Sequence, residues 1–409
     1  MNYKFTKMKK TFILIGSVVT LLFALSSCNS NNLDLDKTLK FSTQTVEQQK
    51  QSIEQNGIDL LNKIDAMKNA KAMVALVTLS NLGSGSPEFI KPVSELRTNL
   101  LTNNVKAVET FNQQMRVAAA LGDDVWGVWT WSSVNEKFVY VAGSSKTVTY
   151  LFPASENSTS NNGELKITYV QSNVVAPGTD PIEYMPKTIT VVLKVSGAVA
   201  LKADYAGSYK TDGTPTKVTQ TLEIEKYNWN IELTNDAKDV SAKYEFKYGK
   251  EVLLKYEVGA AGSFTATNIE NSMNDGNPEN VMTSGAMYFQ VMNIAVLGGF
   301  KDFKGFANDM KAINYTGDKS SNQKQVDALN KYVIMYGLFV KEKKKFAEVE
   351  FYGTERTQTD YNYNTGQYET KIVYELQPRF VLSDGSKVAI EDFFATGFQD
   401  LIDKMKSFK

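Results

Sequence analysis

Hydrophobic and polar residues alternate most regularly between residues 218 and 258. The apolar positions recur with a period of two and belong to one face: Val218, Leu222, Ile224, Trp229, Ile231, Leu233, Val240, Ala242, Tyr244, Phe246, Tyr248, Val252, Leu254, Tyr256 and Val258. The positions between them are mostly Thr, Asn, Lys and Glu, and short turns join the runs. This pattern predicts an antiparallel meander with one solvated face, because short turns cannot make the crossovers that parallel strands need.

A helical period marks the earlier segment 41–120. Thr45 and Gln48 have the spacing of a capping box, which predicts that a helix begins beside them. The apolar positions that follow keep a helical spacing: Leu60, Leu61, Ile64, Met67, Val74 and Val77. A second helix is expected from about Pro92 to Ala120, after a Gly- and Ser-rich break, so this segment is predicted to be an antiparallel helical pair.

The pattern changes again beyond residue 269. Val281–Leu297 is apolar nearly all round, which predicts a centrally buried, Met-rich helix. Another helix is expected from about Asn322 to Lys345, followed by a long Tyr-rich hairpin over 346–376. Asp384-Gly385 predicts a second hairpin turn, and a last helix is expected from Glu391.

Composition excludes several classes of chemistry. The chain has 409 residues, 45 basic and 45 acidic side chains, one cysteine and no histidine. Without histidine there is no Ser-His-Asp triad, no Cys-His pair and no His-ligated zinc or haem. A single cysteine excludes an internal disulfide and a CxxC redox motif. We therefore expect no cofactor and no metal, and we nominate no catalytic residue.

The N-terminus has the pattern of a secretory leader. Four lysines and no acid precede an apolar run from Phe12 to Leu25: Lys4, Lys7, Lys9 and Lys10. The run has 14 positions, whereas a spanning helix needs about 20 residues. A permanent transmembrane anchor is therefore not expected.

The only cysteine follows this run, within Leu25-Ser26-Ser27-Cys28. These residues resemble the lipobox of bacterial lipoproteins, the class processed at a type II signal peptide. The resemblance covers about 30 residues and implies that Cys28 becomes the first residue, carrying acyl chains such as palmitate. In that class Asn29 implies the outer membrane, and the choice between its periplasmic and cell-surface sides stays open.

The predicted fold class is α+β, a curved antiparallel meander with helices packed on its apolar face. The expected segments are a signal peptide (1–27), a lipidated flexible tether (28–40), the helical pair (41–120), the meander (121–268), a helical region with the buried Met-rich helix (269–345), and hairpins with a C-terminal helix (346–409). Residues 41–409 are expected to form one or two compact domains. The leader holds four lysines, so the mature chain has 41 basic and 45 acidic groups, which disfavours nucleic acid as a partner.

Two clusters of soft or aromatic side chains could bind a ligand. Five methionines lie within 38 residues and suit either an adaptable apolar cavity or core filling: Met273, Met282, Met287, Met292 and Met310. Trp129 and Trp131 share one face of a predicted strand and suit either stacking on a sugar or anchoring of the helices. We expect a lipid-anchored binding protein that holds an apolar or amphipathic small molecule between sheet and helices, contacted by the following residues: Met287, Phe289, Met292, Trp129 and Trp131.

Two alternatives remain open. The first is recognition of a surface glycan or protein through the tyrosines of the long hairpin: Tyr352, Tyr361, Tyr363 and Tyr368. The second is a carboxylate-dependent hydrolase, although the adjacent acids Asp123-Asp124 and Glu391-Asp392 do not provide a facing pair. The lysine-rich segment Lys341–Lys345 is expected to end a helix, with lipid phosphate as an alternative ligand.

Overall fold

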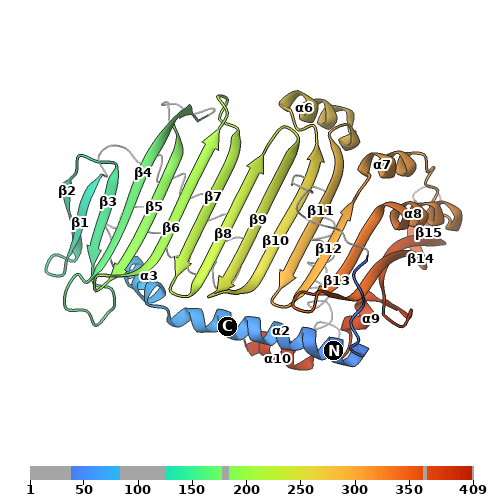
Figure 1. Ribbon diagram of the computed structural model, residues 1–409, viewed down its shortest axis with the longest axis horizontal. Coiled ribbons are helices and arrows are strands. Elements are labelled where there is room, and N and C mark those ends of the chain that lie inside the picture. The colour runs from blue at the N-terminus through green and yellow to red at the C-terminus, as the bar shows by residue number, and fades with distance from the viewer. Residues whose placement is uncertain (1–37, 83–125, 177–183, 363–365, 408–409) are drawn as a thin grey trace.

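A computed structural model describes residues 38–82, 126–176, 184–362 and 366–407 of the chain. Within these ranges the fold is mixed α/β and contains one large sheet of sixteen strands, which does not close on itself (Figure 1). From β3 to β16 each strand pairs antiparallel with the next strand along the chain. At the other end β1 lies parallel to β3 and carries β2 on its outer side.

The strands at the two edges of the sheet, β2 and β16, are short, and the longest strands are β14 and β15. Their bounds are β1 Gly127–Ser132, β2 Lys137–Ala142, β3 Thr147–Phe152, β4 Gly163–Val175, β5 Tyr184–Val195, β6 Ala198–Tyr209, β7 Pro215–Ile224, β8 Tyr227–Asn235, β9 Asp239–Tyr248, β10 Glu251–Gly262, β11 Met282–Val291, β12 Ile294–Phe300, β13 Val333–Phe339, β14 Lys344–Asn362, β15 Gln367–Val381 and β16 Lys387–Ala389. Short edge strands leave few backbone groups open to pairing with another chain.

The helices lie before, between and after these strands. Their bounds are α2 Val46–Ala66, the 3-10 turn η2 Met67–Asn69, α3 Lys71–Asn81, α6 Ala266–Asp275, the 3-10 turn η4 Pro278–Asn280, α7 Phe303–Lys311, α8 Lys319–Tyr332, α9 Ile390–Phe394 and α10 Gln399–Ser407. Among the described residues, no helix is both long enough and apolar enough to cross a bilayer.

The predicted alternation produces two unlike faces. The apolar face carries Leu222, Trp229 and Phe246, which are buried, and Trp229 stacks on Phe246 with ring centroids 4.4 Å apart. The polar face carries cross-strand ion pairs: Lys194–Glu164, Lys217–Glu232 and Lys243–Glu257. The antiparallel, one-sided meander predicted for this stretch is therefore confirmed.

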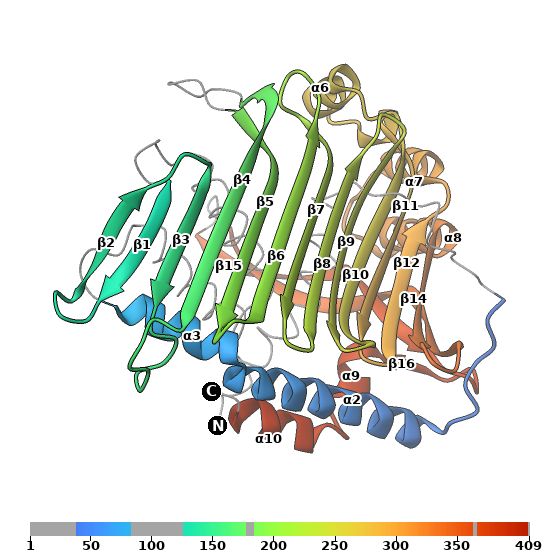
Figure 2. The same ribbon diagram turned by 60° about the vertical axis from the view of Figure 1, so that its left-hand side comes forward.

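The first helix follows the expected capping box. The Thr45 hydroxyl accepts a hydrogen bond from the Gln48 amide, and the Gln48 side chain accepts one from the Thr45 amide. From there α2 and α3 run across the ends of successive strands (Figures 1 and 2). The second predicted helix, Pro92–Ala120, lies outside the described residues.

Polar contacts connect these helices to three hairpin turns that follow one another along one side of the sheet, namely the β7–β8, β9–β10 and β11–β12 turns. The Asn293 amide donates to Asn56 at 2.8 Å, and Lys63 pairs with Glu251 at 3.1 Å. The Tyr227 hydroxyl donates to the Lys63 carbonyl at 2.6 Å. Buried residues of α3 belong to the same hydrophobic cluster as strand residues of the apolar face: Ala72, Met73, Ala75, Leu76 and Leu79.

The prediction of a Met-rich helix over Val281–Leu297 is wrong. These residues form β11 and most of β12, joined by a turn at Met292, whose φ is 52°. The run is apolar all round because this hairpin carries apolar side chains on both faces. Met287 and Phe289, which is 40% exposed, lie on the apolar face, whereas Leu297 joins a buried cluster on the other face that Leu39 contacts. A strand that is apolar on both faces cannot be told from a helix by periodicity alone.

The prediction of a helix from Asn322 to Lys345 is correct only as far as Tyr332. The following residues, Val333–Phe339, form a buried central strand, β13, and Lys344 begins β14. The Lys341–Lys345 segment is therefore a turn and a strand start, not a helix end. Val333–Phe339 is rich in aliphatic and aromatic residues, which favour a strand when neighbouring strands lie on both sides of it.

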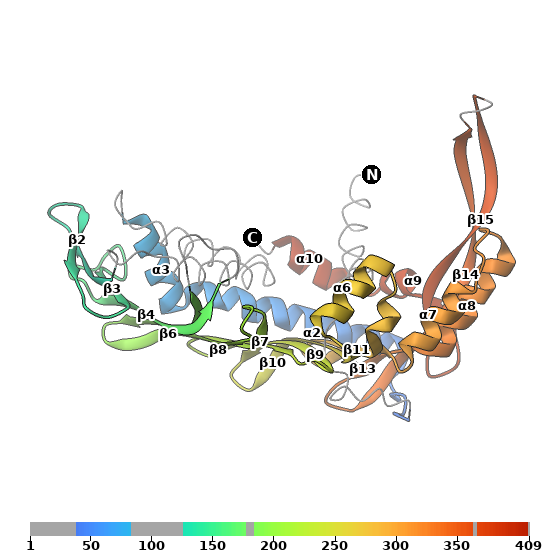
Figure 3. The same ribbon diagram turned by 90° about the horizontal axis from the view of Figure 1, so that it is seen from above.

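The long hairpin β14–β15 is present as predicted and stands out from the body (Figure 3). The second hairpin, β15–β16, is confirmed as well. The expected C-terminal helix is divided into α9 and α10, and α10 packs on α2. The close approach depends on Gly57, since a Cβ there would lie 2.7 Å from a methyl carbon of Leu401.

Candidate functional site

The structure does not bring the five predicted ligand-binding residues together. Trp129 and Trp131 lie on β1, whereas Met287 and Phe289 lie on β11, and eight strands separate them in the sheet. At about 4.8 Å per strand this distance is roughly 40 Å. Met292 is buried in the β11–β12 turn. A single pocket formed by these five side chains is therefore excluded.

The tryptophans have a structural role in the core. Trp129 stacks against Tyr150 and lies 4.6 Å from the ring of Tyr140, and Trp131 meets Phe138 edge to face. Tyr150 is fully buried, and burial raises the pKa of its hydroxyl far above the usual value. The two indoles thus anchor the β1–β3 end of the sheet, which is the core-anchoring interpretation of this pattern.

A cavity of about 610 Å³ lies between α6 and the apolar face of the sheet. Its floor comes from the ends of β7, β8 and β9, and its walls come from α6 and the segment that follows it. The lining residues are Pro215, Thr216, Lys217, Leu233, Thr234, Asn235, Val240, Ser241, Ala242, Phe264, Ile269, Ser272, Met273, Pro278, Val281 and Met282. Two of the five clustered methionines, Met273 and Met282, are among them.

Local sequence fixes the helix that covers the cavity. The Thr265 hydroxyl caps the start of α6, and Gly276 ends it in the left-handed conformation, which glycine adopts without strain. Ile269 and Met273 are one turn apart, so they lie on the same side of α6.

Three apolar side chains of the cavity lining are exposed to solvent, whereas Val240, Phe264 and Val281 are buried. Met273 is 79% exposed, Leu233 is 43% exposed and Ile269 is 40% exposed. All three line the cavity, so the exposed apolar surface converges on one concave site. Such a combination is typical of a site for a ligand with a large apolar part.

The polar groups of the lining are neutral or already paired. Thr216, Thr234, Asn235, Ser241 and Ser272 offer hydroxyl and amide groups. The Lys217 ammonium is paired with Glu232 at 3.0 Å on the polar face. The cavity therefore suits an apolar molecule with hydroxyl or amide groups better than a strongly charged one.

A buried carboxylate fixes the wall of the cavity. Glu279 lies in η4, between the lining residues Pro278 and Val281, and is buried. The Lys311 ammonium of α7 contacts both Glu279 and the Asn277 side chain. Burial acts to raise the pKa of Glu279, but the hydrogen bond and charge of Lys311 outweigh it, so this pKa lies below its usual value.

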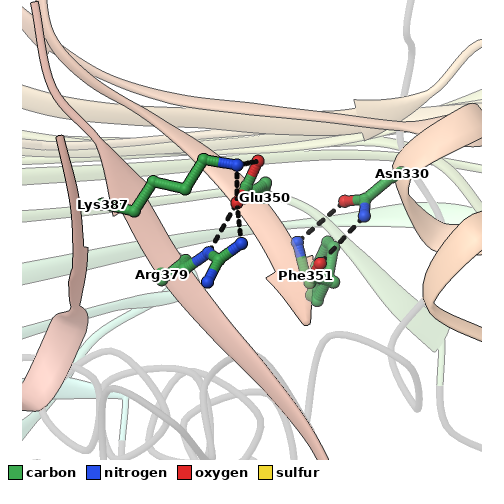
Figure 4. Close-up of polar contacts among 5 residues, drawn as sticks. All are labelled: Asn330, Glu350, Phe351, Arg379 and Lys387. Carbon is green, nitrogen blue, oxygen red and sulfur yellow. Dashed lines mark hydrogen bonds and ion pairs between the residues drawn. The ribbon is translucent and has the colours of Figure 1, made fainter. Parts of the chain in front are cut away.

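A second polar cluster holds the base of the long hairpin (Figure 4). Glu350 of β14 accepts hydrogen bonds from Arg379 at 2.5 Å and from Lys387 at 3.1 Å. Burial opposes ionisation of Glu350, yet the two cations hold its pKa below the usual value. An acid with a lowered pKa and two permanent partners is poorly suited to donate a proton in catalysis.

Asn330 of α8 protects the open edge of β14 beside this cluster. Its amide group donates to the Phe351 carbonyl at 2.8 Å, and its carbonyl oxygen accepts from the Phe351 amide at 2.7 Å (Figure 4). Pairing between β13 and β14 ends at Glu348, so Asn330 replaces the missing strand at this point. Of the alternative hydrolase acids, Glu391-Asp392 form the first turn of α9, and Asp123-Asp124 lie outside the described residues.

The predicted lipid attachment site, Cys28, also lies outside the described residues, which begin at residue 38. In the described part of the chain, no group of three or more metal-binding side chains comes together. No family model matches the chain, and no curated protein or solved structure matches it either.

The sequence contains one local signal for the cavity. Residues 266–275 place Ile269 and Met273 one turn apart, between a Thr cap and Asn-Asp-Gly. The predicted helical region 269–345 does not distinguish this short helix from the residues that follow it. Its partner surface on β7–β9 could not be identified from sequence, because it depends on how far the strands extend.

We predict that Lys311→Met lowers the free energy of unfolding by about 1–3 kcal/mol at neutral pH, because it leaves the Glu279 carboxylate buried without its partner. In the parent protein the lowered pKa of Glu279 contributes stability above 4.5, the ordinary value, and this contribution is lost as pH falls through the folded-state pKa. In the variant the pKa rises, so its deficit should shrink on acidification toward pH ~5. Urea denaturation at several pH values measures both effects.

The double variant Lys311→Met with Glu279→Gln is the control, because it removes the charge as well as its partner. It should recover most of the lost stability. A deficit of equal size at every pH, or in the double variant, would show that Lys311 acts by packing alone.

Proposed function

We propose that this protein is a lipid-anchored binding protein of the outer membrane, and that it holds an apolar or amphipathic small molecule between the sheet and α6. The cavity under α6 carries this proposal. Its volume of about 610 Å³ lies within the range of ligand sites, roughly 300–1,000 Å³. Its apolar rim stays partly in contact with solvent, because Met273 is 79% exposed, Leu233 43% and Ile269 40%.

The proposed ligand site differs in place from the one expected from sequence, and the ligand class is the same. The helix beside the sheet is α6 and not the Met-rich segment. The proposal also includes helices over the apolar face of the sheet. In support of it, α3 contributes residues to the cluster around Trp229, and Phe264, which precedes α6, packs with Val240.

The lipid anchor is supported by the leader and by the single cysteine. A lipid chain at Cys28 supplies membrane affinity without a spanning helix, at about 0.8 kcal/mol per buried CH₂ group. The described body begins at residue 38, so about ten residues connect the proposed anchor to the fold. Extended, such a segment reaches at most about 35 Å.

We predict that Cys28→Ser abolishes lipidation and releases the protein from the membrane fraction. The reason is that the hydroxyl cannot replace the thiol as the acyl-accepting group and no described helix offers another anchor. Metabolic labelling with radioactive palmitate, followed by membrane fractionation, tests this. Ser27→Ala keeps a small residue before the cysteine and should remain labelled. Palmitate retained by the Cys28→Ser variant would contradict the anchor.

We predict that Ala242→Phe weakens binding of the neutral fluorophore N-phenyl-1-naphthylamine at least roughly tenfold, because the new ring fills the cavity floor. The parent protein, as residues 29–409, should show saturable fluorescence enhancement. Titration of the dye measures the affinity of each variant.

Ala206→Phe provides the matched control, because this alanine lies on the polar face, paired with Thr219. It should bind the dye as the parent does. The ligand-site proposal fails if the parent shows no saturable binding, or if both variants bind equally well.

A second candidate function is recognition of a glycan or protein by the tip of the long hairpin. Tyr361 and Tyr368 are paired across the strands and meet edge to face at 5.2 Å. They are 44% and 75% exposed, so two aromatic rings project from a protruding ribbon (Figure 3). Tyr352 does not join them, since its ring lies under the Arg379 guanidinium at the hairpin base, and Tyr363 is outside the described residues.

For this candidate we expect the double substitution of Tyr361 and Tyr368 to Ala to lower binding to a glycan array at least roughly tenfold, since each stacked ring contributes on the order of 1 kcal/mol. Tyr184→Ala removes a comparably exposed ring at the distant end of the sheet and serves as the control. Array binding unchanged by the double substitution would refute recognition through the hairpin tip.

A further inference from the structure

The first described residues are fixed beside the turn between β13 and β14. The Ser42 amide donates to the Lys345 carbonyl at 2.7 Å, and the Lys345 amide donates to the Lys40 carbonyl at 2.9 Å. Phe41 forms a parallel bridge with Lys345. The described part of the chain therefore begins beside this turn.

This turn carries an excess of positive charge. Lys341, Lys343 and Lys40 are exposed, and Lys344 is half-buried. The one acid among them, Glu342, accepts a hydrogen bond from the Asn293 side chain at 3.0 Å. Within the described part of the chain none of the four lysines forms an ion pair, whereas the neighbouring Lys345 is buried and pairs with Glu348 at 2.5 Å.

The turn is held in one conformation by the body. The Lys341 amide donates to the Asn293 side chain at 2.7 Å, and the Val340 amide donates to the Asn293 carbonyl at 2.8 Å. Lys343 adopts a positive φ of 51°. The Lys345 ammonium lies over the rings of Phe41 and Tyr336, which ties the same strand to the N-terminal segment. The exposed lysines thus project from a rigid support.

These lysines lie beside the first described residues, which are close to the proposed anchor along the chain, so their charge can act on the membrane surface that holds the anchor. Eleven residues lie between Cys28 and Lys40, so the turn stays within about 40 Å of the proposed anchor even when that segment is extended. The whole mature chain carries four more acids than bases and is weakly repelled by an anionic surface. Attraction to such a surface therefore depends on a local excess of lysine near the anchor.

We propose that Lys341, Lys343 and Lys344, together with Lys40, form a docking surface for the anionic headgroups of the membrane that holds the anchor. The inference rests on the proposed anchor, since only that anchor brings the turn to a bilayer. Docking orients the body, because the turn lies at the ends of β13 and β14, whereas α6 and the cavity lie at the opposite ends of the strands (Figure 1). The cavity then opens away from the bilayer.

The experiment uses unlipidated residues 29–409, which contain every described element, so that failure of lipidation cannot affect it. Binding is measured by co-sedimentation with vesicles of phosphatidylcholine containing about 30% phosphatidylglycerol, and with pure phosphatidylcholine, at low salt. We expect binding only to the anionic vesicles. The triple variant K341Q/K343Q/K344Q should bind roughly 100-fold more weakly, from about 1 kcal/mol per lysine near the surface.

The control variant K137Q/K166Q/K187Q removes the same charge from exposed lysines of β2, β4 and β5 at the far end of the sheet. It should bind as the parent does. Thermal unfolding should be the same for all three proteins, since none of the changed side chains is buried. Equal losses in both triple variants, or equal binding of the parent to neutral and anionic vesicles, would overturn the proposal.

Discussion

The structure depends on covering one face of a single open sheet. Sixteen strands form one layer, so the apolar side chains along one face need cover from outside the sheet. Two helices, α2 and α3, cross the strand ends and are fixed to consecutive hairpin turns, and buried residues of α3 join the hydrophobic cluster of the apolar face. Short helices are also inserted between strands and are places where a helix meets the sheet.

The cavity under α6 is such a place. The helix is anchored by Phe264 and Val281, which are buried with Val240 and Ala260. The Lys311–Glu279 contact holds the segment after it. Ile269 and Met273 then remain open to solvent above Leu233. The capped helix is thus held on both sides, while Ile269 and Met273 line the cavity that we propose as the ligand site.

In our proposal, three regions of the molecule have different functions. The long hairpin is held at its base by Glu350, Arg379 and Lys387, and its aromatic tip extends beyond the body. The N-terminal segment is fixed at the β13–β14 turn, where Lys341, Lys343 and Lys344 lie. We thus propose a membrane-facing turn, a ligand cavity and a protruding ribbon at separate positions along one sheet.

The sequence by itself determined the elements whose evidence is local. The Thr45–Gln48 capping box, the alternation from Val218 to Val258, and the hairpin that ends near Tyr361 all depend on neighbours within a few residues. Only the tertiary structure decided that Val281–Leu297 is a hairpin, because its hydrophobic run is equally compatible with a buried helix until the strands that pair with it are known. It also decided that Trp129 and Met287 are far apart while Leu233 and Met273 share a cavity. The order and extent of strand pairing set these distances, and no local pattern encodes them.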